Sequence, residues 1–355
     1  MACEPAGKNR PRPGDHSIGM DLEILMENTP GLSIEKAMIN FIELIAQSRS
    51  ENTARSYANA MSAFGFILDE NGIDPAEANL EKLPEDSISW FAGFLKDFAP
   101  STEQMYLVAV TRFFQYLAAE ELTQVNLQRI NLLRQTRARK PGVRLPQFPK
   151  EDLEKVIQYA ASLHTIAGEN LSDRLRNYRD RAFILTLADT GMRVHEACNL
   201  RRGDLDWMEH KALIIGKGNQ QAVIRFSKRS IQGLKDYLAA RAELDGMSGR
   251  PLTSLPLFAR HDKGAGSKIK PIATGTGRNI VNYRVAQTLG ANAVGTITPH
   301  SFRHYFVTNA LVGSGGNLKL AQELARHKNI QVTQRYAHLS NDELDRSYAE
   351  IFDQD

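Results

Sequence analysis

Apolar residues recur at helical spacing through the first third of the chain, and this periodicity restricts the fold more than any other feature. Between Ser33 and about Leu133 it runs through SIEKAMINFIELIAQSR, SENTARSYANAMSAFGFILDENG, EDSISWFAGFLKDF and STEQMYLVAVTRFFQYLAAEEL. An apolar residue at every third or fourth position gives a helix one face to bury. No alternating strand pattern interrupts these stretches. The sequence therefore predicts an all-helical domain of about four helices over residues 31–133.

A basic, proline-bearing segment follows. Residues 134–149 contain three prolines, and residues 129–150 carry seven Lys or Arg side chains and no acid. Proline favours an extended backbone, so we expect a connection between two domains here. This connection is either a solvated linker or a strap along a phosphate backbone, with Arg137, Arg139 and Arg144 as candidate DNA contacts.

After residue 149 helical stretches flank a single pair of strand-like runs. The stretch KALIIGKGNQQAVIRF places two β-rich runs around GKGN, which is typical of a hairpin turn. The helical stretches are KEDLEKVIQYAASLH, RNYRDRAFILTLADTG, SIQGLKDYLAARAEL, TGRNIVNYRVAQTLG, SFRHYFVTNALVG and NLKLAQELARH. We therefore expect a second, mainly α domain with a small antiparallel β-sheet over residues 150–355.

Composition narrows the class of protein. The chain of 355 residues is longer than one compact domain usually is, and a net charge of +3 does not by itself indicate nucleic acid. Cys3 and Cys198 form neither a disulfide framework nor a metal-ligand spacing, which suits a cytoplasmic protein without a metal. Residues 1–30 resemble a disordered leader rather than a signal peptide. No apolar stretch is long enough to cross a bilayer, so no membrane partner is expected.

Four short patterns in the second domain contain the candidate functional residues: TGMRVHEACNL, IGKGNQ, TPHSFRHYFVTNAL and ARHKNIQVTQRYAHL. Their chemically capable side chains are Arg193, Glu196, Lys217, His300, Arg303, His304, His327 and Tyr336. His300, Arg303 and His304 stand at i, i+3 and i+4 and can share one helical face. HEACN lacks the second histidine of a zinc-protease motif, so a metal site is not indicated.

These residue types together suit attack on a phosphodiester. Arginine forks bind two non-bridging oxygens and stabilise the charge of a phosphorane. A lysine can protonate a leaving alkoxide, and a histidine can exchange a proton with a phenol. A tyrosine, with a reference pKa of about 10, forms a reversible phosphodiester that conserves bond energy. Such a reaction requires neither ATP nor a cofactor.

The order of these residues resembles the tyrosine recombinase, or phage integrase, family. ADTGMRVHEACNLRRGDLD, ITPHSFRHYFVTNAL and HKNIQVTQRYAHLS are similar to its three signature blocks. The N-terminal helices resemble its SAM-like core-binding domain. The resemblance extends from about Ser33 to Ile351, and the layout is similar to that of Xer-type recombinases and simple two-domain integrases.

The resemblance implies a site-specific recombinase that cuts and rejoins duplex DNA through a 3′-phosphotyrosine. Arg193 and Arg303 would clamp the scissile phosphate, and Tyr336 would attack it. Lys217 would protonate the leaving 5′ oxygen. The expected partners are DNA with inverted-repeat sites and further copies of the chain, as a dimer on one site and a tetramer in synapsis. A related recombinase is a further possible partner.

The resemblance also assigns supporting roles. His300 would be the acid/base partner of the tyrosine, His327 would donate a hydrogen bond to the phosphate, and Glu196 would support the active-site arginine. One position departs from the family pattern. Arg326 stands where the family often has glycine, so either the local backbone differs or Arg326 contacts phosphate.

Two other functions are open on the sequence alone. One is a topoisomerase of type IB, which uses similar chemistry as a monomer, and the other is a helical DNA-binding regulator without catalysis. Against the first stands the C-terminal tail, where Leu344, Tyr348 and Ile351 form one helical stripe. Recombinases of this family exchange such a tail between protomers.

Tyr305 is a second candidate nucleophile, because it lies beside His304 in sequence. On a helix it points about 200° away from Arg303, at about 100° per residue. We therefore expect Tyr305 to pack with Phe306 and Leu311, and His304 to be structural or to support the site indirectly.

Overall fold

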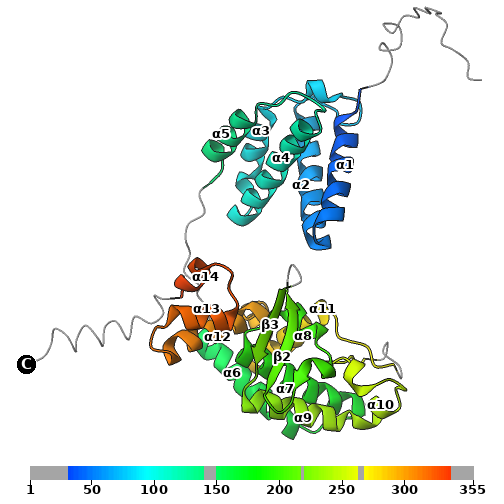
Figure 1. Cartoon of the computed structure of the whole chain (residues 1–355), viewed down its shortest axis with the longest axis vertical. Coiled ribbons are helices and arrows are strands. Elements are labelled where there is room, and N and C mark those ends of the chain that lie inside the picture. Colours follow the sequence, from blue (N-terminus) through cyan, green and yellow to red (C-terminus); the bar gives the residue numbers. More distant parts are fainter. Residues whose placement is uncertain (1–30, 140–148, 217–219, 263–267, 337–355) are drawn as a thin grey trace, which may run out of the picture. The chain divides into compact units, whose positions relative to one another are not determined.

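The structure is a computed structural model that describes residues 31–139, 149–216, 220–262 and 268–336. The chain divides into two compact units, Met1–Val143 and Arg144–Asp355 (Figure 1). Each unit has a hydrophobic core of its own. The predicted fold class is confirmed, because the described residues are mainly helical with one small antiparallel sheet. Among them, no helix combines the length and the apolar character that spanning a bilayer requires. The expected leader and the C-terminal tail lie outside the described residues.

Helices packed around aromatic side chains form the N-terminal unit. They are α1 (Ile34–Ser48), α2 (Glu51–Glu70), α3 (Ser87–Phe94), α4 (Pro100–Ala119) and α5 (Leu127–Arg137), with short 3-10 turns η1 (Leu80–Lys82) and η2 (Leu95–Asp97). Ser33 and Ser50 cap α1 and α2 by accepting backbone N–H groups, which satisfies donors that a helix start leaves unpaired. Phe41, Phe64 and Phe113 are buried where the helices meet.

Helix α5 was not predicted. It buries a single hydrophobic residue, Ile130, so its sequence carries little helical periodicity. Ile130 enters the core of the unit, and Arg129 pairs with Glu85 and Asp86 just before α3. Because α5 continues to Arg137, the first residues of the expected linker segment are helical.

The C-terminal unit surrounds one central helix. Its helices are α6 (Lys150–Ser162), α7 (Leu171–Thr190), α8 (Val194–Asn199), α9 (Lys228–Ala240), α10 (Ala242–Gly246), α11 (Thr274–Leu289), α12 (Pro299–Gly313), α13 (Leu318–Ala325) and α14 (Ile330–Gln334). Its 3-10 turns are η3 (Leu163–Thr165), η4 (Arg202–Asp204), η5 (Leu252–Ser254) and η7 (Ala291–Ala293). Helix α7 contacts α6, α8, α9 and α12, and the continuous run from Arg179 to Ala188 is buried. A helix that is buried on every side belongs in the middle of a core.

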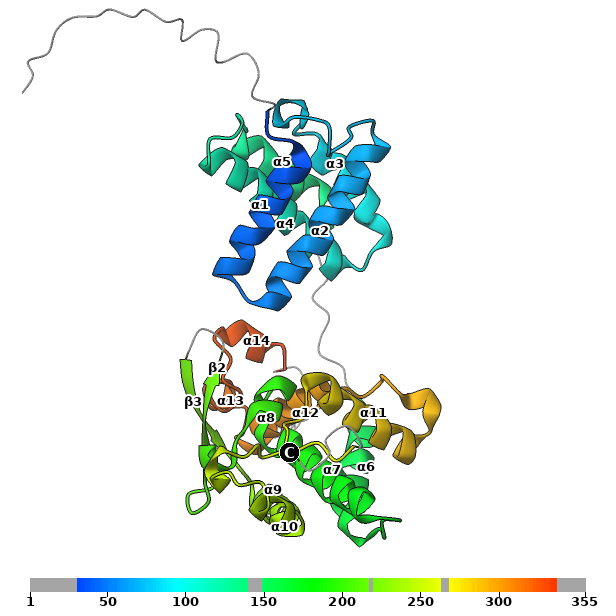
Figure 2. The ribbon, with the colours of Figure 1, turned by 90° about the vertical axis from the view of Figure 1, so that its right-hand side faces the viewer.

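The predicted hairpin is present. Strands β1 (Leu205–Asp206), β2 (Lys211–Gly216) and β3 (Gln220–Arg225) form an antiparallel sheet in the order β1-β2-β3. The register pairs Lys211 with Arg225 and Gly216 with Gln220. β2 ends at the same end of the unit as α14 (Figures 1 and 2). Lys217 lies outside the described residues.

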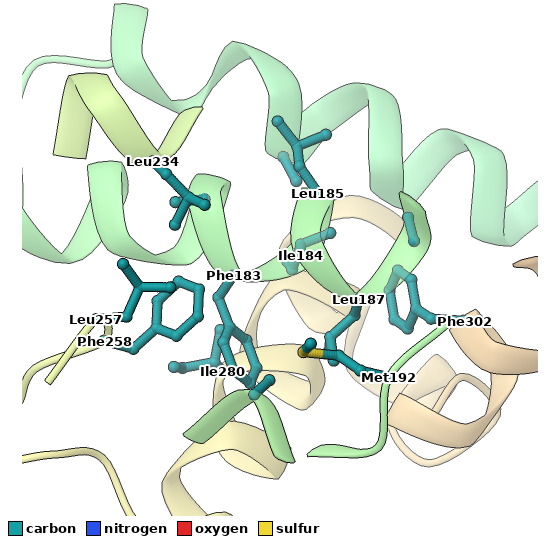
Figure 3. Close-up of a cluster of buried hydrophobic side chains, with 14 of the residues drawn as sticks. Phe183, Ile184, Leu185, Leu187, Met192, Leu234, Leu257, Phe258, Ile280 and Phe302 are labelled. Carbon is teal, nitrogen blue, oxygen red and sulfur yellow. The ribbon is translucent and has the colours of Figure 1, made fainter. Parts of the chain in front are cut away.

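The core of this unit fixes where α7 ends. Phe183 packs edge-on against Phe258, with ring centroids 5.1 Å apart. Figure 3 shows Leu187 and Met192 beside Phe302, which α12 contributes. Apolar packing therefore holds the C-terminal end of α7 against α12. The turn after α7 leads to Arg193, and α12 carries His300 and Arg303.

Candidate active site

Helix α7 ends at Gly191, whose backbone is left-handed with φ 58° and ψ 18°. A Cβ at this position would lie 2.3 Å from Cδ1 of Phe306, so the close approach of α12 requires glycine. The carbonyl of Gly191 accepts a hydrogen bond of 2.6 Å from Nη1 of Arg303. The turn therefore positions one of the two predicted clamp arginines.

Arg303 is almost fully buried, with 3% of its surface exposed. Its Nη2 donates to the carbonyl of Ala325, the last residue of α13. The guanidinium thus lies at the C-terminal ends of α7 and α13, where helix dipoles favour a positive charge. Burial lowers the pKa of Arg303 to about 10, with Arg193 and Arg326 adding to the effect. The side chain is still a cation at neutral pH.

Arg193 and Glu196 form one unit at the start of α8. Arg193 is the N-cap residue, and its backbone N–H donates to Oε2 of Glu196 at 2.8 Å. Its Nη1 donates to Oε1 of the same carboxylate at 3.0 Å, while the arginine side chain stays half-exposed. Burial alone would raise the pKa of Glu196, but Arg326 and Arg193 together hold it below its usual value.

Arg326, the residue that departs from the family pattern, caps α13 in a left-handed conformation with φ 56° and ψ 43°. Glycine is the residue that most readily adopts this backbone at a helix end. The local backbone is therefore the left-handed turn that glycine would form, with an arginine in its place. The Arg326 side chain reaches back to α8, where Nη2 lies 3.1 Å from Oε2 of Glu196.

Three histidines lie near these arginines. The rings of His300 and His304 meet edge to face on α12, with centroids 4.4 Å apart. Nδ1 of His327 lies 2.9 Å from the hydroxyl of Thr333. Burial lowers the pKa of His304 and of His327 to about 4, and neighbouring positive groups add to both shifts. The pKa of His300 is also lowered, by desolvation and then by Arg303 and Arg193. These imidazoles are neutral at pH 7.

Tyr336 follows α14 and is buried, with 3% exposure. Its ring packs with apolar residues of α12 and α13, and its backbone N–H donates to Thr333 at 2.9 Å. The phenolic hydroxyl is hydrogen-bonded to Nδ1 of His304. Burial raises the pKa of Tyr336 to about 12, although Arg303 and Arg335 oppose the shift. The partner of the hydroxyl is thus His304, for which the sequence predicts only a structural or supporting role.

A cavity of about 430 Å³ opens beside these groups. Arg193, His300 and Arg303 line it, together with Arg278 and Asn282 of α11. The four sequence motifs do not include these two α11 residues. Their i, i+4 spacing on a predicted helix nevertheless places both side chains on one helical face. Tyr336 and His327 are not among the lining residues.

The remaining predicted residues fall elsewhere. Arg137 and Arg139 belong to the N-terminal unit, where Arg139 forms an ion pair with the buried Glu103. Lys217 and Arg144 lie outside the described residues. Within the described ranges, no cluster of three or more His, Cys, Asp or Glu residues could hold a metal ion.

The expectation for Tyr305 needs one correction. Tyr305 packs against the main core of the C-terminal unit, whereas Phe306 and Leu311 belong to the cluster around Tyr336. Successive helical residues point about 100° apart, which separates Tyr305 from its neighbour Phe306.

The sequence and the fold resemble those of known proteins. Residues 150–343, more than half of the chain, match the phage integrase family. The chain belongs to the phage integrase family. It is Xer-like over most of its length: it is 27% identical over 326 residues to tyrosine recombinase XerC of Bacillus subtilis (strain 168), covering 91% of this chain and 96% of that protein. It is also 29% identical over 312 residues to XerC of Bacillus pumilus (strain SAFR-032), covering 87% and 93%.

Solved structures share the fold. XerH site-specific recombinase bound to a palindromic difH substrate has a TM-score of 0.63 at 20% identity, over 89% of this chain and 83% of that one. A lambda integrase dimer bound to a core site has a TM-score of 0.55 at 17% identity, over 86% and 95%.

Proposed function

We propose that this protein is a site-specific recombinase that cuts and rejoins duplex DNA through a 3′-phosphotyrosine at Tyr336. One observation carries the proposal: Arg193, Arg303 and His300 line one cavity, and the hydroxyl of Tyr336 is bonded to a histidine on the same helix as Arg303. A phosphodiester in that cavity would meet two guanidinium groups, which suit its non-bridging oxygens.

In the proposed reaction, a neutral histidine of α12 accepts the phenolic proton of Tyr336. His304 bonds the hydroxyl before DNA binds, and His300 lines the cavity toward which the tyrosine moves. The phenolate oxygen then bonds to phosphorus as the bond to the 5′ oxygen breaks, and Lys217 supplies the proton for that oxygen. His300, beside His304, is the second histidine that can hold the proton. Arg193 and Arg303 stabilise the charge of the transition state, and His327 donates to the phosphate. No cofactor takes part.

The proposed nucleophile needs to move before it reacts. Tyr336 is buried against α12 and α13, and its raised pKa of about 12 disfavours the phenolate. A phosphate between the arginines would bring negative charge into the cavity, and we propose that DNA binding draws the segment after α14 toward it. Cleavage would then depend on a bound site.

The proposed substrate is duplex DNA with inverted repeats, bound by a dimer on each site and a tetramer in synapsis. Support comes from two solved structures of DNA complexes: XerH bound to a palindromic difH substrate and a lambda integrase dimer bound to a core site. Leu344, Tyr348 and Ile351 of the tail would dock on a neighbouring copy, and a related recombinase could take the place of one copy. DNA as substrate suits a cytoplasmic location. The biological roles that fit are integration or excision, chromosome-dimer resolution and transposition.

Recombination is preferred over the two alternatives. The chain covers most of the length of relatives that are named recombinases, which favours neither a type IB topoisomerase nor a regulator without catalysis.

The test is covalent capture on a nicked site. Tyr336→Phe removes only the hydroxyl, so folding and DNA affinity should persist while the covalent protein–DNA complex disappears. Tyr305→Phe is the matched control and should retain the complex. Denaturing electrophoresis followed by peptide mapping locates the linkage. A DNA-linked peptide that contains Tyr305, or an adduct formed by Tyr336→Phe, would show that the assignment is wrong.

A further inference from the structure

Arg326 adopts a backbone conformation that its side chain does not favour. Its φ of 56° lies in the left-handed region, which among the described non-glycine residues only Glu121 and His210 share. Hydrogen bonds fix the turn, because the N–H of Arg326 donates to Glu323 and that of His327 to Gln322. Glycine would adopt this turn without strain. A long charged side chain at such a position therefore calls for a contact that offsets the strain.

The contact is with Glu196, on the other side of the site. Arg326 has only 13% of its side chain exposed and Glu196 only 4%, so the ion pair between them is largely shielded from water. Oε2 of Glu196 also accepts the backbone N–H of Arg193, and Oε1 accepts Nη1 of Arg193. One carboxylate thus accepts hydrogen bonds from the start of α8 and forms an ion pair with the arginine at the end of α13.

The ion pair with Arg326 reduces how far Glu196 neutralises the positive charge of Arg193. A buried carboxylate paired with Arg193 alone would neutralise much of the charge that the cavity offers to a phosphate. Arg326 adds a second cation on the same carboxylate, so Arg193, Arg303 and Arg326 face a single negative charge. Arg326 also connects the Arg193 turn to the segment that continues to His327 and Tyr336.

We propose that Arg326 is a positioning residue, which holds Glu196 and through it sets the orientation and effective charge of Arg193. The inference rests on the proposed function and deepens it. Direct contact of Arg326 with DNA phosphate is the rival role. The low exposure of Arg326 and the 3.1 Å between its Nη2 and Oε2 of Glu196 favour positioning. Neither Nη2 nor Nε of Arg326 has a hydrogen-bond acceptor among the described residues, so the contact with Glu196 is an ion pair.

The two roles separate in a double-mutant cycle. Arg326→Gly suits the left-handed turn and removes only the side chain, and Arg326→Asn is a second variant compatible with that turn. Each should lower the single-turnover rate of covalent-complex formation by about tenfold to a hundredfold at saturating DNA, the scale of a small misplacement of a catalytic group. DNA affinity and its salt dependence should be unchanged. Arg326→Lys should recover part of the rate.

In a Glu196→Gln background, Arg326→Gly should cause little further loss, because both changes break the same connection. A wild-type rate for Arg326→Gly would overturn the inference. A second result would also overturn it: the rate losses of the two single variants multiply in the double variant, DNA binding weakens, and the salt dependence of DNA binding becomes flatter. That result identifies a contact between Arg326 and a DNA phosphate. If the wild-type protein forms no covalent complex, the proposed function fails and this inference fails with it. If the wild-type protein forms the covalent complex and Arg326→Gly forms it at the same rate, the proposed function stands and only the role inferred for Arg326 is wrong.

Discussion

Single backbone positions decide whether the site residues meet. Gly191 brings α12 close to the end of α7 and presents its carbonyl to Arg303. Ala325 presents a second carbonyl to the same guanidinium. These acceptors belong to the backbone, so the identity of the side chain at position 325 matters less than where α13 ends. At position 191 the absence of a side chain is the requirement.

Gly191→Ala should destabilise the C-terminal unit by about 2–4 kcal/mol, from the left-handed backbone and the crowding against Phe306. Gly249→Ala is the control. It has a similar φ of 65° with no atom within 4 Å of the added Cβ, and should cost about 1–2 kcal/mol. Urea unfolding of the two variants measures the difference. Equal losses would mean that Phe306 moves aside freely.

Two half-buried histidines, His304 and His327, should make stability depend on pH. His304 and His327 have pKa values near 4 in the folded protein, below the usual value of about 6.5. The unfolded chain therefore binds more protons between about pH 6.5 and 4. The stability contributed by neutral histidines is complete above that window and is lost as pH falls through it, by up to about 1.4 kcal/mol per pH unit for each proton.

His304→Asn removes one of these groups and should flatten the loss. The measurement is the change in the urea unfolding midpoint between pH 7.5 and pH 5.0, for the wild-type protein and for His304→Asn. Comparing the changes avoids comparing the two stabilities at a single pH. Parallel losses in wild type and variant would show that His304 does not titrate in this window.

At the scale of elements, sequence predicts helices well where one face is buried. It missed α5, because this helix buries only Ile130 and so has no apolar stripe, and its other contacts, such as the ion pairs of Arg129, come from distant parts of the chain. The same limit applies to the site. Arg193, His300, Arg303 and Tyr336 could be picked out from their motifs. The pairing of Tyr336 with His304, and of Arg326 with Glu196, depends on how separate helices pack, which no local pattern records.

Just after α5, the contacts of Arg139 allow a test of whether this basic residue stabilises the N-terminal unit. Glu103 of α4 is fully buried and paired with Arg139, whose backbone N–H also donates to it at 2.8 Å. Arg139 Nη2 donates to the carbonyl of Phe98 at 2.6 Å as well. Arg139→Ala should therefore destabilise the N-terminal unit by about 1–3 kcal/mol, because a buried carboxylate loses a charged donor.

Arg137→Ala is the matched control, since this arginine is exposed and should change stability by less than about 0.5 kcal/mol. If Arg137 contacts phosphate, its loss should reduce the salt slope of DNA binding by about one. If Arg139→Ala is as stable as the wild-type protein, Arg139 does not stabilise the N-terminal unit and is again a candidate for contact with DNA phosphate.

For the whole molecule, the separation of the two cores has a thermodynamic consequence. The N-terminal core contains Phe64 and the C-terminal core contains Phe183, each fully buried, and the two clusters share no residue. Units with separate cores unfold as separate cooperative transitions when little energy couples them.

Phe64→Ala should cost the N-terminal unit about 3–5 kcal/mol and lower only its transition, and Phe183→Ala should do the same for the C-terminal unit. Hydrogen exchange followed by peptide measures each unit in the intact chain, because amides protected by one core should lose protection only when that core is weakened. Bound DNA adds a second comparison. A ligand held by both units adds its binding free energy to both unfolding equilibria, so protection should rise in each. Loss of protection in both units from either substitution in the DNA-free protein would show that the chain unfolds as one cooperative body.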